Sequence, residues 1–514
     1  MSIELNKQEI CITDDKCSAS VKAITESDII VPDSKSDCIE ILEVNPLPVI
    51  SEKYVSKDYI TLTGNLNYKI LYSGEEGKVE SIEYSAPFSK QIDAAGSEEG
   101  MSVYVKCFVS HIEYSVINSR KINVKSVMNV KAKAWNKSSA ALVDCVEGDV
   151  CMPVRTKKVN SFNMVLCSDR NFSVNESVKL PGASPDIDNI LKYEVKIADT
   201  ELKVVSNKVI ARGNILLNTL YTNEGEIYSV QNEIPFTHIA DVEGILSDMY
   251  CTSDYEIKNI ICEKNLDEDG SMSLIEFNAD MCLIIRAYDE KEVEFISDVY
   301  SPDFEIDVEK KDIFVTEMID AQTGQCTVSQ SCGADTDVEK IYSVTSKVLS
   351  DKVEISGNSV VVSGNLKAVV LYRGMSDSVL RSMSADIPFS CDMPISRVFE
   401  SENAFADADA FVEHESYSIE GGNSIKLRFI IRVNSTVKCN YNISAVTDIS
   451  VDENKKTDKS SQSGITVYFV QNGDDMWNIA KRYHTMPSDI VSVNSLDENA
   501  PLYVGQQLLI PKRS

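Results

Sequence analysis

The stretch GNLNYKILY, residues 64–72, returns as GNILLNTLY at 213–221 and as GNLKAVVLY at 364–372. The glycines that open the three copies, Gly64, Gly213 and Gly364, are 149 and 151 residues apart. Two further elements keep the same order around each copy. An Asp-led segment precedes it at 37–42, 186–191 and 337–342, and a Pro-Phe pair follows it at 87–88, 235–236 and 388–389. Offsets this constant indicate that one domain of about 150 residues occurs three times.

Apolar residues alternate around each glycine, and this period of two predicts half-buried β-strands. In the first copy the alternating residues include Leu62, Leu66, Tyr68 and Ile70. Glycine inside a strand mostly serves backbone geometry, so each glycine is expected to mark a bend or bulge where two sheets close. Later strands are expected at 122–134, 274–286 and 425–437.

The fold is therefore predicted to be mainly β, with three tandem antiparallel, sandwich-like repeats at residues 1–150, 151–300 and 301–446. A polar linker is expected at 447–464, because no apolar residue follows Val451 before Gly464. Such a composition predicts a flexible tether that lets the last module move around the repeats.

Residues 465–513 follow a different pattern, which predicts a small strand–helix–helix–strand (βααβ) unit. The first strand is expected at 468–471, the first helix at 477–483, the second helix around 489–490, and the last strand within 502–511. Trp477, Ala480 and Tyr483 recur every three residues, which indicates one buried helical face. Asp474 lies close to the first free amides of the helix, where a carboxylate is favoured.

This C-terminal unit resembles a LysM domain, and the resemblance implies binding of N-acetylglucosamine polymers such as peptidoglycan. The groove of that family lies between the first strand–helix loop, here 473–476, and the second helix–strand loop, here 492–496. Asp475 stands where the family usually has Thr or Ser; a carboxylate only accepts hydrogen bonds, so either the ligand has changed or Asp475 is simply a helix N-terminal acid. Among the candidates, Asp474, Asp475, Met476, Asn494 and Leu496 are expected to be the exposed contacts. The binding set comprises Gly473, Asp474, Asp475, Met476, Trp477, Asn494 and Leu496.

The three repeats resemble the SPOCS domain of spore-coat morphogenetic proteins in endospore-forming bacteria. Tandem SPOCS domains followed by one LysM domain imply a non-enzymatic adaptor that works in the mother-cell cytoplasm and attaches the coat to the forespore surface. The partner that the resemblance implies is the coat morphogenetic ATPase SpoIVA, bound through the LysM domain, with other coat proteins on the β repeats. The alternative is a peptidoglycan-binding protein at the spore cortex or cell wall.

The composition of the chain argues against some classes of partner and indicates the cellular compartment. The chain of 514 residues has 80 acidic and 50 basic residues and a net charge of −30, which opposes nucleic acid and anionic lipid. The first residues, MSIELNKQEI, are too polar for a signal peptide, and no apolar run of about 20 residues follows. The protein is therefore expected to be cytosolic. Its 14 cysteines include no CxxC pair, so free thiols are expected and a zinc site is not.

No pattern of residues predicts catalysis, a cofactor or a metal site. The histidines His111, His238 and His414 fall at unmatched positions in the repeats, and no GxSxG or HExxH motif occurs. The segment 265–270 with Glu276 has near-EF-hand spacing, but its flanks are predicted strands, so an acidic hairpin turn is expected there.

Overall fold

The computed structural model describes residues 3–182, 184–376, 379–397, 403–458, 463–497 and 501–512. Each repeat is built from two three-stranded antiparallel sheets. In the first repeat, one sheet has the order β1-β6-β5 and the other β2-β3-β4. Their bounds are β1 (Ile3–Ile30), β6 (Lys121–Gly148), β5 (Ser102–Asn118), β2 (Glu40–Ser56), β3 (Tyr59–Ser73) and β4 (Val79–Asp93), with a short 3-10 turn η1 (Glu75–Gly77) before β4.

The second and third repeats have the same topology. The second pairs β7 (Val154–Lys179), β12 (Leu274–Val299) and β11 (Tyr250–Asn265), and separately β8 (Asn189–Val205), β9 (Lys208–Asn223) and β10 (Glu226–Asp241). The third pairs β13 (Phe304–Gly333), β18 (Ser424–Lys456) and β17 (Ala404–Glu420), and separately β14 (Val338–Ser356), β15 (Ser359–Gly374) and β16 (Leu380–Pro394). Each pair of sheets encloses an apolar core, so the predicted mainly-β, sandwich-like repeats are confirmed.

The glycine that opens each repeated stretch lies in a central strand and lets a neighbour approach closely. A Cβ on Gly64 would lie 2.2 Å from the Val49 carbonyl oxygen and 3.0 Å from the Phe88 ring. Phe88 pairs with Gly64 in register, as Phe236 does with Gly213, which explains why a Pro-Phe pair follows each glycine. The expected irregularity lies in the partner strand: β2 has a bulge between Ile50 and Glu52, beside Gly64.

A second bulge in each repeat brings the three sandwiches together around one apolar centre. The register shifts between Ile41 and Glu43 in β2, and β8 and β14 shift at the equivalent place. The extra residue in each strand, Leu42, Leu191 or Tyr342, is buried in a cluster shared by all three repeats. Each repeat contributes three equivalent positions to this cluster: Leu42, Leu71 and Val79; Leu191, Leu220 and Ile227; Tyr342, Leu371 and Leu380.

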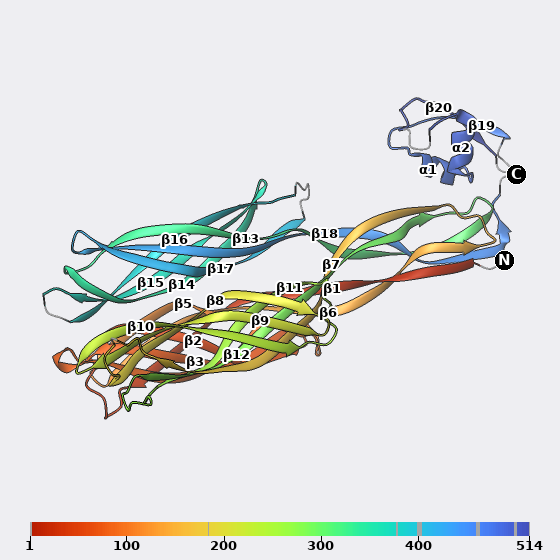
Figure 1. Ribbon diagram of the computed structural model, residues 1–514. Helices are drawn as coiled ribbons and strands as arrows, with labels where there is room; N and C mark the ends of the chain where they lie inside the picture. Colours follow the sequence, from red (N-terminus) through yellow and green to blue (C-terminus); the bar gives the residue numbers. More distant parts are fainter. Residues whose placement is uncertain are drawn as a thin grey trace.

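The longest strands run beyond the sandwiches and form a stalk (Figure 1). It consists of the antiparallel pairs β1/β6, β7/β12 and β13/β18, one from each repeat. Residues from all three pairs share its core, including Leu142, Phe295 and Val315. Both ends of the chain lie near the tip of the stalk, beside the C-terminal module.

The C-terminal module has the predicted βααβ order, with β19 (Ile465–Phe469), α1 (Met476–Arg482), α2 (Pro487–Asn494) and β20 (Gln507–Pro511). Its strands form a two-stranded antiparallel sheet. The last strand occupies only the second half of the predicted range 502–511, because residues 502–506 include a turn in which Gly505 has φ +83°.

The predicted linker at 447–464 was wrong over its first ten residues. β18 continues to Lys456 and pairs with β13 as far as Phe304, so the third repeat extends beyond residue 446. The polar residues there are compatible with a strand because most of them are exposed, while their backbone pairs with β13. Residues 459–462 of the predicted linker lie outside the described part of the chain.

The expectation of free thiols was wrong for one pair of cysteines. Cys326 of β13 and Cys391 of β16 form a disulfide, with Cα atoms 5.6 Å apart, that links the two sheets of the third repeat. The sequence separation of 65 residues hid this pairing, since only the packing of one sheet on the other brings the two side chains together.

The acidic segment after β11 is a hairpin turn between strands β11 and β12, as predicted. Asp267 accepts hydrogen bonds from the backbone N–H groups of Asp269 and Ser271, and it forms an ion pair with Lys179. Within the described ranges, no helix is long and apolar enough to cross a membrane.

Candidate binding site on the C-terminal module

Asp475 caps the first helix of the module and also contacts the stalk. One carboxylate oxygen, Oδ1, accepts a hydrogen bond from the Asn478 backbone N–H at 2.6 Å, so Asp475 is the N-cap of α1. The other oxygen, Oδ2, accepts from Arg155 Nη1 of β7 at 3.0 Å. Of the two interpretations of Asp475, the helix N-terminal acid agrees with this geometry.

Asp474 holds the first loop together and is not an exposed contact, so that expectation was wrong. Its side chain is only 8% exposed. It accepts hydrogen bonds from the Tyr468 hydroxyl and from the Gln471 backbone N–H, and the Tyr468 bond is the main reason that the pKa of Asp474 is lowered. Gly473, at φ +86°, supplies the tight turn just before it.

Trp477 faces the stalk. Its indole Nε1 donates a hydrogen bond to Asp298 Oδ2 of β12 at 2.8 Å. Its ring packs edge to face against Tyr300, with ring centroids 5.0 Å apart and planes at 75°. Met476 is half-buried against the core of the module.

The two candidates of the second loop also serve the module's own fold. Asn494 donates to the carbonyl oxygens of Ile490 and Leu509 at 2.8 and 2.7 Å and accepts from the Leu509 backbone N–H at 2.7 Å. It therefore fastens α2 to β20. Leu496 is half-buried against the core. Neither residue is a freely exposed contact, contrary to expectation.

Asp298 is the main polar anchor between the module and the stalk. Besides Trp477 it contacts Lys481 Nζ at 2.8 Å and Lys310 Nζ at 2.8 Å, and its side chain is 18% exposed. Burial alone would raise the pKa of Asp298, but hydrogen bonds from Lys310, Lys481 and Trp477 outweigh it and lower the pKa to about 2. Asp298 is therefore a charged carboxylate under ordinary conditions.

Sequence reasoning missed Arg155, Asp298 and Tyr300, which complete the surroundings of the first loop. They lie in β7, in β12 and just after β12, far from the module in sequence. Nothing in their local sequence distinguishes them from other residues in and beside the strands. Only the length of the stalk, which brings its tip to the module, places them there.

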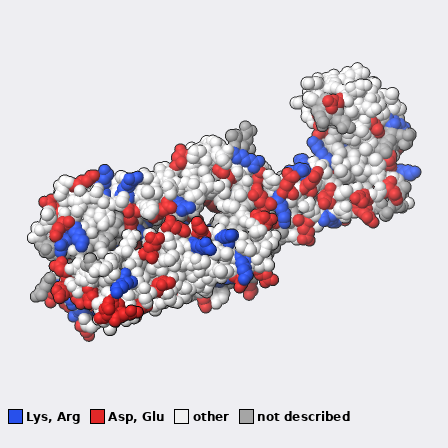
Figure 2. Space-filling model, in the orientation of Figure 1, with Lys and Arg blue, Asp and Glu red and all other residues white. Residues whose placement is uncertain are grey.

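The outer face of the module's sheet exposes apolar side chains. Ile465, Val467 and Phe469 of β19 are 57%, 51% and 54% exposed, and alternate residues of a strand share one face. Leu509 pairs with Val467 in register and extends the same face onto β20. We call these four residues the outer stripe. Figure 2 shows acidic side chains gathered along the stalk, whereas most of the visible face of the module is uncharged.

Family comparisons agree with this architecture. The model for "SipL, SPOCS domain" matches residues 37–117, 186–265 and 337–420, and the LysM domain model matches residues 468–511. Neither curated proteins nor solved structures gave a match. Both families are non-catalytic binding domains, and together they support a coat-associated sporulation protein, with LysM suggesting carbohydrate binding. The chain therefore has the SipL-type architecture of three SPOCS domains followed by a C-terminal LysM domain.

Proposed function

We propose that this protein is a non-enzymatic adaptor of spore-coat assembly, whose LysM domain binds the coat morphogenetic ATPase SpoIVA at the forespore surface, on the mother-cell side. In this proposal the three SPOCS repeats, up to about residue 456, supply spacing and contacts to other coat proteins. The observation that carries it is the outer stripe.

The outer stripe suits a protein partner. Contiguous exposed apolar side chains mark interaction sites more often than scattered ones do. Phe469 supplies an aromatic anchor, a residue type enriched at the centres of protein interfaces. The stripe also lies on the sheet face that the two helices do not cover, so a partner can reach it while the module stays on the stalk.

While the module is docked on the stalk, the first loop is less suited to a sugar. Both oxygens of Asp475 already accept hydrogen bonds, from Asn478 and Arg155. A carboxylate offers no donor to the carbonyl of an N-acetyl group, and an anion costs free energy to bury against an uncharged sugar.

The second candidate function is peptidoglycan binding, which the LysM family match favours. Exposed aromatic residues such as Tyr503, which is 69% exposed, could stack on sugar rings. The two functions make different predictions for the outer stripe and for glycan retention.

The test offers the full-length protein to purified SpoIVA and, separately, to insoluble peptidoglycan. Phe469→Asp should weaken SpoIVA binding on the order of tenfold or more, as loss of an aromatic anchor does. The matched control is Phe314→Asp, which places the same charge on a 70% exposed stalk residue of β13 and should bind normally. Wild-type retention on peptidoglycan with no SpoIVA binding would instead establish the glycan-binding alternative.

A further inference from the structure

The LysM core includes a residue from outside the module. Tyr300, which follows β12 and belongs to the repeats, is 4% exposed and packs in the same cluster as Ile479, Ile490 and Leu508. Its hydroxyl donates a hydrogen bond to the Thr485 carbonyl oxygen at 2.7 Å, in the turn between α1 and α2. A tethered module that moved freely would have its own closed core, so the packing of Tyr300 indicates one fixed orientation.

Polar contacts from the stalk also hold the face of the module that Tyr300 contacts, at both ends of α1. Arg155 pairs with Asp475 at the start of the helix, and Asp298 pairs with Trp477 and Lys481 along it. Cys151 Sγ lies 3.7 Å from Met486 Sδ at the turn after it. The partners on the stalk come from residues 151–155 and 298–300, which adjoin at the stalk tip.

These contacts engage one side of the first of the two loops between which a LysM groove lies, and the Asp475 side chain stays 40% exposed. Asp475 and Trp477 belong to the expected ligand set, and both face the stalk. The outer stripe lies on another face and stays exposed. In this state the outer stripe is free, whereas the Trp477 indole and one carboxylate oxygen of Asp475 are engaged by the stalk.

We propose that the stalk tip is an intramolecular lid, which holds the LysM module closed and excludes N-acetylglucosamine polymers from its first loop until the contact opens. A ligand that requires the open state binds with an apparent affinity reduced by the fraction of molecules that are open. This proposal does not depend on the binding of SpoIVA to the outer stripe.

Tryptophan fluorescence tests the lid in the full-length protein. The chain has two tryptophans, and Trp135 is buried at 2% exposed, so changes in acrylamide quenching report on Trp477. Asp298→Ala should shift the emission to longer wavelength and raise the quenching constant roughly twofold or more by populating the open state. Arg155→Ala, at a half-exposed position, should do the same to a smaller degree.

Glu292→Ala is the control, because Glu292 lies on the same strand in an exposed ion pair with Lys158. It should leave the quenching of Trp477 unchanged. Unchanged quenching in both Asp298→Ala and Arg155→Ala, with circular dichroism that shows folded protein, would mean that no lid operates.

The second arm titrates the same proteins with a soluble N-acetylglucosamine hexasaccharide. Asp298→Ala should bind it on the order of tenfold more tightly than wild type, in proportion to the gain in open molecules. If the opened variant binds no better, the stalk does not exclude a glycan and the lid proposal fails. SpoIVA is absent from both arms, so this result is independent of the proposed adaptor function.

Discussion

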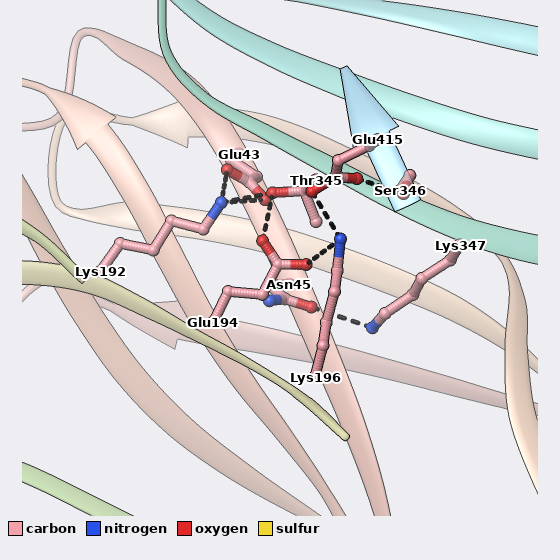
Figure 3. A network of polar contacts seen from close by, with 9 residues as sticks. All are labelled: Glu43, Asn45, Lys192, Glu194, Lys196, Thr345, Ser346, Lys347 and Glu415. Atoms are coloured by element: carbon pink, nitrogen blue, oxygen red, sulfur yellow. Dashed lines mark hydrogen bonds and ion pairs between the residues drawn. The ribbon is translucent and has the colours of Figure 1, made fainter. Parts of the chain in front are cut away.

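Lys192 Nζ lies 2.9 and 2.7 Å from the two carboxylate oxygens of Glu43, although the residues belong to different repeats and both are buried. Figure 3 shows that this pair is part of a polar network to which all three repeats contribute. Thr345 of the third repeat links Lys192 to Glu194, and Lys196 pairs with Glu415. Lys192 and Glu43 occupy equivalent positions after the bulges of β8 and β2, so the repeats differ in charge where they meet.

Lys192→Met should strongly destabilise the protein because it leaves Glu43 buried without its cation. Loss of one partner of a buried ion pair costs about 3–5 kcal/mol. Thermal unfolding followed by circular dichroism measures the loss. Lys158→Met, in a pair with both side chains more than half exposed, should melt at nearly the same temperature as wild type.

The double variant Glu43→Leu with Lys192→Met separates charge from packing. Replacing a buried ion pair by apolar residues is often nearly neutral, so the double variant should recover most of the stability lost in Lys192→Met. No recovery would show that the network around Thr345 and Glu194, more than the pair itself, requires the lysine.

Gly64→Ala should destabilise the first repeat. The new Cβ would lie 2.2 Å from the Val49 carbonyl oxygen. The paired strands β2 and β3 cannot move apart without breaking the hydrogen bonds between them. Overpacking of this kind costs about 1–3 kcal/mol. Gly333→Ala is the matched control, since Gly333 also lies in a strand but has no atom within 4 Å of the added Cβ. Equal urea midpoints for the two variants would contradict the role assigned to Gly64.

The alternation of apolar residues over short stretches predicted the fold well, but the sequence predicted the surroundings of the binding site poorly. Alternation around Leu66 and Tyr68 is set by burial on one face of a sheet, so it is visible in a few residues. The contacts of Trp477 depend instead on Asp298, which lies in another domain. The Cys326–Cys391 disulfide was hidden for the same reason, since sheet packing is not encoded within either strand.

Reduction of the Cys326–Cys391 disulfide should destabilise the third repeat. Closing a loop of 65 residues constrains the unfolded chain and contributes about 4 kcal/mol in the chain-entropy model. Peptide mapping without reductant should recover the cross-linked pair, and dithiothreitol should lower the melting temperature of the wild type. Cys326→Ser should melt at the reduced temperature with or without dithiothreitol. A Cys332→Ser variant should keep the response, because Cys332 is a free thiol of the same strand.

The contact between the LysM module and the stalk should weaken in acid through Asp298. Its pKa in the folded protein is about 2, below the ordinary value of 3.8, so the charged form is favoured by folding. The stabilisation is therefore complete above pH 3.8 and is lost as the pH falls through about 2, and a shift of this size corresponds to about 2 kcal/mol.

Urea unfolding followed by tryptophan fluorescence should show wild type more stable than Asp298→Asn at about pH 6, with the difference shrinking below about pH 4. Glu292→Gln, in an exposed pair, should show no such pH-dependent difference from wild type. A constant difference between wild type and Asp298→Asn down to acid pH would mean that Asp298 acts through its shape and not through its charge.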